Sequence, residues 1–90
     1  MELIVKMSNK VLVELVIPIL EESFDVYIPV NLKLGNVIEL CSKAVSDLSG
    51  GYFTISDTSV LYNGYTGVQY GVDILVRNTD IRNGTRLILM

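Results

Sequence analysis

The stretch Asp80-Ile81-Arg82-Asn83-Gly84-Thr85-Arg86-Leu87-Ile88-Leu89-Met90 decides how the rest of the chain must be arranged. Its Asn83-Gly84 pair predicts a tight turn, because both residues tolerate a positive φ. The alternating run that follows turns Leu87 and Leu89 to one face and Ile88 to the other. A strand entered in this way must pair with strands laid down earlier, so the rest of the sequence is expected to build the sheet that receives it.

Length and composition predict one compact domain. The chain has 90 residues, of which 50% are hydrophobic, and this is ample for a core. The net charge is −3, and the 7 Lys and Arg residues are scattered rather than gathered into a stripe. This charge pattern disfavours nucleic acid and anionic membrane surfaces as partners.

The cysteine count and the apolar runs indicate the compartment. Cys41 is the only cysteine, so no intramolecular disulfide can form, as is usual in a reducing compartment. The longest apolar run, from Val11 to Leu20, is interrupted by Glu14 and Pro18 and is too short to span a bilayer. Residues 1–9 lack the features of a signal peptide. We therefore expect a cytoplasmic protein without direct membrane insertion.

The first half of the chain predicts a hairpin. Val11–Ile17 is rich in β-branched and aliphatic residues, and Phe24–Val30 alternates apolar and polar positions. The polar turn Glu21-Glu22-Ser23 between them indicates an antiparallel pair, and Pro18 limits how far the first strand can continue. Residues 1–9 are expected to form an arm or an extra edge strand, laid on the sheet or on a second copy. Residues 10–90 are expected to form a single domain.

A helix is predicted from Gly35 to Leu48. Its apolar stripe is Val37, Cys41, Ala44 and Leu48, widened by Ile38 and Val45. The polar residues Glu39, Ser42, Lys43, Ser46 and Asp47 are expected to cover the opposite side. Gly50-Gly51 ends the helix. Because only one stripe is apolar, we expect the helix to pack on one face of a sheet.

The second half of the chain predicts further strands. They are expected at Thr58–Tyr62, which Asn63-Gly64 turns, around Val68–Tyr70, and at the carboxyl-terminal run. Tyr52–Asp57 is interpreted as a connection, and Val72–Val76 as an apolar packing segment. The order β-β-α-β-β-β predicts an α+β domain with a mixed sheet of four to five strands and one helix on one face.

This order resembles the ubiquitin-like β-grasp fold over residues 10–90. The resemblance is carried by the hairpin that feeds directly into the helix, by Val60-Leu61-Tyr62-Asn63-Gly64, and by Asp80 to Leu87. It implies that the last strand is central in the sheet, beside the first strand and parallel to it.

Within that fold, the chain resembles the small YukD/EsaB-like proteins of bacterial type VII secretion systems. The shared features are the Tyr27-Ile28-Pro29-Val30 entry to a helix led by Val37-Ile38, and the ending Ile81-x-Asn83-Gly84-x-x-Leu87. The N-terminal arm is a departure from the shortest members. The resemblance implies a protein partner, such as a component of the secretion machinery.

No arrangement of residues indicates an enzyme, a cofactor or a metal site. The chain has no histidine, and Cys41 lies on the apolar stripe, where a buried core thiol is expected. A cysteine cluster for zinc is absent. Gly64-x-x-Gly67-x-x-x-Gly71 lacks the lysine of a phosphate-binding loop and is interpreted as turns.

A protein-interaction patch is the remaining candidate site. If Leu87 and Leu89 face the helix, the alternation leaves Ile88 and Met90 on the outer side, and Leu61 is expected to join them. Tyrosines near one turn are either half-buried strand residues or a recognition edge, since tyrosine is enriched at interfaces. The candidate patch is Leu61, Tyr62, Tyr65, Tyr70, Ile88 and Met90.

Three functional hypotheses follow. The first is a non-catalytic ubiquitin-like interaction module, an accessory or regulatory component of a type VII secretion system that is not covalently conjugated. The second is a ubiquitin-like modifier or sulfur carrier, which the ending Leu87-Ile88-Leu89-Met90 disfavours because such carriers need a free Gly-Gly tail. The third is a self-associating structural module, a homodimer formed through the N-terminal arm or a sheet edge.

Overall fold

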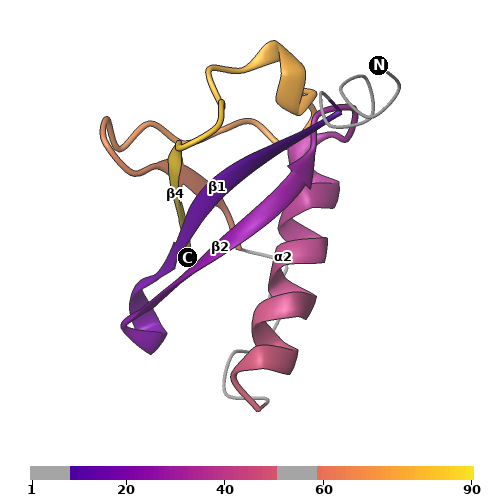
Figure 1. The fold of residues 1–90 in the computed structure, drawn as a ribbon. Helices are drawn as coiled ribbons and strands as arrows, with labels where there is room; N and C mark the ends of the chain where they lie inside the picture. The colour runs from indigo at the N-terminus through magenta and orange to yellow at the C-terminus, as the bar shows by residue number, and fades with distance from the viewer. Residues whose placement is uncertain (1–8, 51–58) are drawn as a thin grey trace.

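The computed structural model describes residues 9–50 and 59–90. The residues it describes form four strands, one long helix and two short 3-10 helices (Figure 1). In chain order these are β1 (Lys10–Ile17), η1 (Pro18–Leu20), β2 (Glu22–Pro29), α2 (Leu34–Leu48), β3 (Leu61–Asn63), η2 (Val76–Asn78) and β4 (Arg86–Leu89). The predicted α+β class is confirmed. The arm expected at residues 1–9 and the connection at 52–57 fall outside the described residues, apart from Asn9.

The last strand is central in the sheet, as predicted. The strand order is β2-β1-β4-β3, and β4 runs parallel to β1 with Leu15 beside Leu87 and Val16 beside Ile88. β1 pairs antiparallel with β2, and β3 pairs antiparallel with β4. The expected contact between the first and last strands, on which the β-grasp prediction depends, is therefore present.

The turn before β4 docks directly onto β1. Gly84 has a φ of 88°, which glycine adopts without steric cost, but Asn83 does not have the positive φ that the turn predicted for it. Its side chain instead acts as a backbone substitute: Asn83 Oδ1 accepts a hydrogen bond of 2.8 Å from the Leu12 N–H. The Gly84 N–H donates to the Leu12 carbonyl at 2.8 Å. These two hydrogen bonds extend the pairing with β1 to residues that precede the start of β4.

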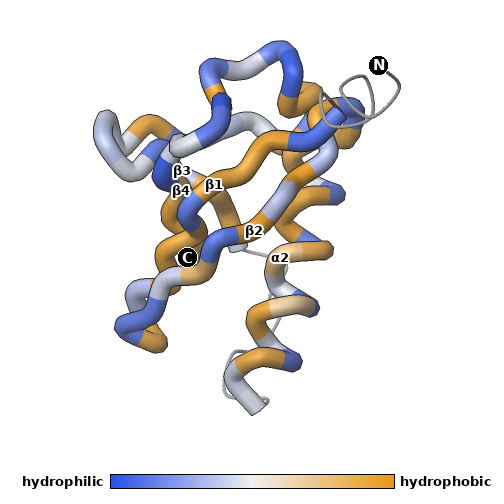
Figure 2. The backbone as a smooth tube through the Cα atoms, in the orientation of Figure 1, coloured by the Kyte–Doolittle hydropathy of each residue, from blue (hydrophilic) through white to orange (hydrophobic). Residues whose placement is uncertain are grey.

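The core lies between the sheet and α2. Alternate residues of β1, β3 and β4 face the helix, and Figure 2 shows β1 and β4 as largely apolar. Fully buried members on the strands are Val13, Leu15, Ile17, Leu61, Leu87 and Leu89. Ile81, in the turn before β4, is 2% exposed and also belongs to the core. The helix covers these side chains and leaves the other sheet face without a packed layer of described residues.

The buried face of α2 differs from the predicted stripe. Ala44 and Leu48 were expected in the core, yet Ala44 is exposed and Leu48 is 65% exposed. Ser42 was expected in solvent and is completely buried, and no described residue forms a hydrogen bond with its Oγ. The helix begins at Leu34, and its buried residues are Leu34, Val37, Ile38, Cys41, Ser42 and Val45. The predicted burial of Val37, Ile38, Cys41 and Val45 is confirmed, whereas the buried face is turned from Ala44 and Leu48 toward Leu34 and Ser42.

The segment before η2 stabilises the start of α2. No side chain caps the helix; instead the Leu34 and Gly35 N–H groups each donate a 2.9 Å hydrogen bond, to the carbonyls of Ile74 and Val72. A Cβ on Gly35 would lie 3.3 Å from the Val72 carbonyl oxygen, so glycine permits this approach. Of the expected packing segment, only Val76 is buried, whereas Val72 and Ile74 are 47% and 45% exposed. The segment acts mainly through its backbone.

The strand predicted around Val68–Tyr70 is reduced to one isolated bridge, between Tyr62 and Gln69. Gly67, with a φ of 75°, closes a tight turn in which its N–H donates to the Asn63 carbonyl at 2.8 Å. The Tyr70 N–H then donates to the Leu61 carbonyl at 2.9 Å. Because residues 63–67 form this turn, they cannot continue as a longer strand.

Candidate functional site

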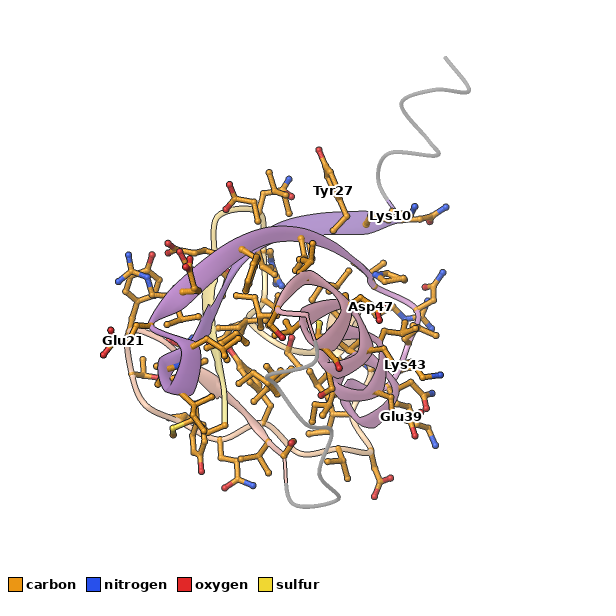
Figure 3. All side chains as sticks on the ribbon, turned by 90° about the horizontal axis from the view of Figure 1, so that it is seen from below. Lys10, Glu21, Tyr27, Glu39, Lys43 and Asp47 are labelled. Atoms are coloured by element: carbon orange, nitrogen blue, oxygen red, sulfur yellow. The ribbon has the colours of Figure 1, made fainter. Side chains whose placement is uncertain are left out.

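The sheet face opposite α2, which we call the outer sheet face, carries the candidate site. The strand register places Ser23, Val16, Ile88 and Tyr62 in one row across the four strands, and Asp25, Glu14 and Arg86 in the next. Leu12 and Tyr27 are paired further along the same face. Figure 3 shows Tyr27 pointing away from α2, and it is 61% exposed. Within the described chain, no second helix covers this face.

A shallow depression lies on the outer sheet face. Its volume is ≈ 410 Å³. The lining residues are Glu14, Val16, Glu21, Glu22, Ser23, Gly64, Arg86 and Ile88. Val16 and Ile88 are half-buried neighbours in the sheet and form its apolar part, while the carboxylates lie around them. A polar rim around an apolar centre is the usual anatomy of a protein-binding surface.

One side of the depression is an ordered charged cluster. Arg86 Nε donates to Glu14 Oε1 at 2.7 Å, and the Arg86 guanidinium carbon lies 5.4 Å from the centre of the Tyr65 ring. The hydrogen bond and the charge of Glu14 raise the pKa of the Arg86 guanidinium. A Cβ on Gly64 would lie 2.5 Å from Arg86 Cγ, so the side chain of Arg86 lies across this glycine. Glycine at 64 thus lets arginine span from Glu14 toward Tyr65.

Four residues of the predicted patch lie at the surface or partly so. Tyr62 and Ile88 are cross-strand partners and are half-buried. Met90 is 57% exposed and Tyr65 is 69% exposed. The structure therefore brings Tyr62 and Ile88 together on the outer sheet face, with Tyr65 beside Arg86.

Leu61 was wrongly expected on the outer side. It is completely buried, because it is the cross-strand partner of Leu89 and shares its inward face. Alternation from Leu61 then turns Tyr62 outward, beside Ile88.

Tyr70 was also wrongly placed in the patch. It is 9% exposed, and its hydroxyl accepts a 3.0 Å hydrogen bond from Asn63 Nδ2 and donates at 2.7 Å to Asp80 Oδ1. Burial is the main cause that raises the pKa of Tyr70 to about 12, and the hydrogen bond to Asp80 is the second. Asn63 Oδ1 in turn accepts from the Tyr65 and Thr66 N–H groups. Tyr70 therefore ties the Tyr65–Tyr70 turn to the chain before β4.

Val16, Glu14 and Arg86 lie in the candidate site, although the sequence did not single them out. The signal that would have found them is the parallel pairing of the first and last strands. Once Leu15 is set beside Leu87, Val16 must lie beside Ile88 and Glu14 beside Arg86.

Two candidates for chemistry remain to be checked among the described residues: the thiol of Cys41 and a cluster of metal-ligating side chains. Cys41 is buried, as expected, and burial raises the pKa of its thiol to about 11. Within residues 9–50 and 59–90, no group of three or more metal-ligating side chains comes together. In the same ranges no helix has both the length and the apolar composition to cross a membrane.

The structure is similar to several solved ubiquitin-like domains. The EccD5 ubiquitin-like domain from Mycobacterium xenopi has a TM-score of 0.73 and 14% identity, over 90% of this chain and 92% of that one. The ubiquitin-like domain of the Mycobacterium tuberculosis type VII secretion system protein EccD1 has a TM-score of 0.70 and 15% identity, over 89% and 96%. The fold is the ubiquitin-like β-grasp. No protein-family model matches the sequence, and no curated protein matches it.

The ubiquitin-like β-grasp fold does not determine function by itself. A chain of the toluene 4-monooxygenase HD complex has a TM-score of 0.75 at 8% identity, over 89% of this chain and 95% of that one. Ubiquitin-like domains of secretion proteins and a monooxygenase complex thus share one fold, and function must be argued from the site.

Proposed function

We propose that this protein is a non-catalytic ubiquitin-like interaction module that binds a protein partner through the outer sheet face. The observation that carries the proposal is the row Val16, Ile88 and Tyr62. These side chains lie next to one another across three strands on the face that α2 does not cover. Contiguous apolar surface with a polar rim is typical of protein-binding sites.

The charged residues around the apolar row favour specific binding over non-specific association. Arg86 is held between Glu14 and Tyr65, so one side of the apolar row is preorganised. The opposite end carries the exposed carboxylates of Glu21 and Glu22. A partner must match both the apolar row and this pattern of charge, because rim charges mainly determine which partner is accepted.

We further propose that the module is an accessory or regulatory component of a bacterial type VII secretion system, acting in the cytoplasm without covalent attachment. Two observations support this proposal. The sequence resembles the YukD/EsaB-like proteins at the helix entry and in the final turn and strand. The fold is shared with the ubiquitin-like domains of EccD5 and EccD1.

The test is co-purification of the protein with its partner from the native host. Ile88→Asp is expected to reduce partner recovery at least tenfold, because burying an unpaired carboxylate in an interface centre costs about 2 kcal/mol or more. Met90→Asp, at a 57% exposed position, gives a second variant with little risk to folding. Leu61 is unsuitable because it belongs to the core.

The matched control is Val72→Asp, which makes the same kind of change at a 47% exposed apolar residue away from the outer sheet face. Circular dichroism checks that every variant is folded. Equal recovery of the partner with Ile88→Asp, Met90→Asp and Val72→Asp would contradict the proposed surface. An intact-mass increase that fits a covalent adduct would contradict the non-covalent mode of action.

A further inference from the structure

The free edge of β2 is a second surface with the means to bind a protein. β2 ends the sheet order, and it pairs with β1 along its whole length, from Glu22 beside Ile17 to Pro29 beside Lys10. The Val30 N–H donates to the Asn9 carbonyl at 2.9 Å, in register with these pairs. Antiparallel hydrogen bonding alternates, so the backbones of Phe24, Val26 and Ile28 face β1.

The intervening residues Ser23, Asp25 and Tyr27 therefore turn their N–H and carbonyl groups outward from the sheet. Within residues 9–50 and 59–90, no other backbone segment pairs with them. The Glu14 N–H confirms this alternation from the other side of β1, because it donates to Thr85 at 3.0 Å, toward β4. Such a row of backbone groups is a template for an added strand.

The charges of Glu22 and Asp25 are the main protection of this edge against pairing. Proteins usually block such edges with lysine, proline or a bulge. β2 contains no lysine, and its one proline, Pro29, lies at the last position. The register with β1 is continuous over eight pairs, so no bulge interrupts it. Among the residues that the structure describes, none therefore occupies the edge from Ser23 to Tyr27.

A groove beside the edge offers apolar contacts on the helix side. Its volume is ≈ 320 Å³, and Leu20, Phe24 and Leu48 are among its lining residues. Leu48, which the sequence placed in the core, is 65% exposed here, and Phe24 is half-buried. An added strand would direct alternate side chains toward this groove. Its other side chains would lie on the outer sheet face, next to Asp25 and Tyr27.

Charge determines the kind of occupant. Glu21, Glu22 and Asp25 are exposed at this edge, and the chain as a whole carries a net charge of −3. In the antiparallel register that pairs Ser23, Asp25 and Tyr27 of two copies, Asp25 would lie opposite its own copy. Like charges in that position are destabilising, whereas a cationic residue is favourable. This register of a second copy is therefore disfavoured, and a partner with a cationic residue opposite Asp25 is favoured.

We propose that β2 binds an extended segment of another protein as an added strand, with apolar residues on the helix side and a lysine or arginine opposite Asp25. This surface is distinct from the apolar row of Val16, Ile88 and Tyr62. Binding at the edge and binding at the row can therefore be tested separately.

The test uses the full chain, labelled with nitrogen-15, and a blocked Val-Lys-Val-Lys-Val peptide as the probe. The peptide is expected to shift the amide resonances of Ser23, Asp25 and Tyr27 and to slow their hydrogen exchange. A peptide of the same composition without alternation, Lys-Lys-Val-Val-Val, is expected to bind more weakly. Asp25→Lys is expected to weaken binding of the alternating peptide about fivefold, because an attractive cross-strand pair becomes repulsive.

The matched control is Glu39→Lys, the same charge reversal at an exposed residue of α2 that lies away from the edge (Figure 3). It is expected to leave the affinity unchanged. Equal weakening by both variants, or an absence of shifts at the edge at millimolar peptide, would overturn the proposal. Shifts confined to Val16, Tyr62 and Ile88 would also overturn it, while leaving the proposed function intact.

Discussion

At the scale of single residues, the side chains of α2 contribute unequally to stability. Ile38 is 7% exposed and belongs to the core, whereas Leu48, one of the residues that the sequence pattern favoured, is 65% exposed. Ile38→Ala is expected to lower the free energy of unfolding by about 2–5 kcal/mol, because it leaves a cavity. Leu48→Ala is expected to change it by about 0.5 kcal/mol or less. Chemical denaturation measures both, and equal costs would mean that the helix is rotated.

The buried thiol of Cys41 predicts slow chemistry and a pH effect. Burial raises its pKa from an ordinary value of about 9 to about 11, so the folded protein holds little thiolate near neutral pH. A thiol reagent is expected to label the native protein far more slowly than the unfolded protein.

Because the pKa of the Cys41 thiol is raised in the folded protein, its contribution to stability is complete below pH 9 and is lost as the pH rises to about 11. In Cys41→Ala this part of the alkaline loss should disappear; an unchanged pH profile would contradict burial as its cause.

At the scale of elements, the turn before β4 depends on one side chain. Asn83 Oδ1 accepts from the Leu12 N–H at 2.8 Å and thereby holds this turn against β1. Asn83→Ala is expected to lower the free energy of unfolding by about 0.5–1.5 kcal/mol, the usual net value of one hydrogen bond. Asn78→Ala, at an exposed asparagine in η2, is the control and should be near neutral. A loss with Asn78→Ala equal to that with Asn83→Ala would contradict this role.

The strands, the helix and the turns also show which parts of the fold and of the candidate site the sequence could predict. The hairpin, the helix and the closing strand were predictable, because each has a strong periodicity and turn residues at its ends. The orientation of Leu61 was not, since three residues of β3 carry too short a pattern to fix a face. Tyr70 was missed because its burial depends on Asn63 and Asp80, which only the folded turn brings to it. The role of Asn83 as a backbone substitute likewise depends on its distant partner Leu12.

At the scale of the whole molecule, one helix and a four-stranded sheet leave two surfaces of different character. The outer sheet face offers side chains, with Val16, Ile88 and Tyr62 at its centre. The edge of β2 offers backbone groups in an acidic setting.

Site-specific photo-crosslinking in the native host tests the central claim most directly. A photoreactive amino acid would replace Tyr62, which belongs to the row on the outer sheet face, or the exposed Met90 after β4, or Lys43 on the solvent side of α2 (Figure 3). We predict that the first two positions capture the same protein, a component of the secretion machinery, and that position 43 does not. Capture of that protein only from position 43, or no capture from positions 62 and 90, would contradict the outer sheet face as the binding surface.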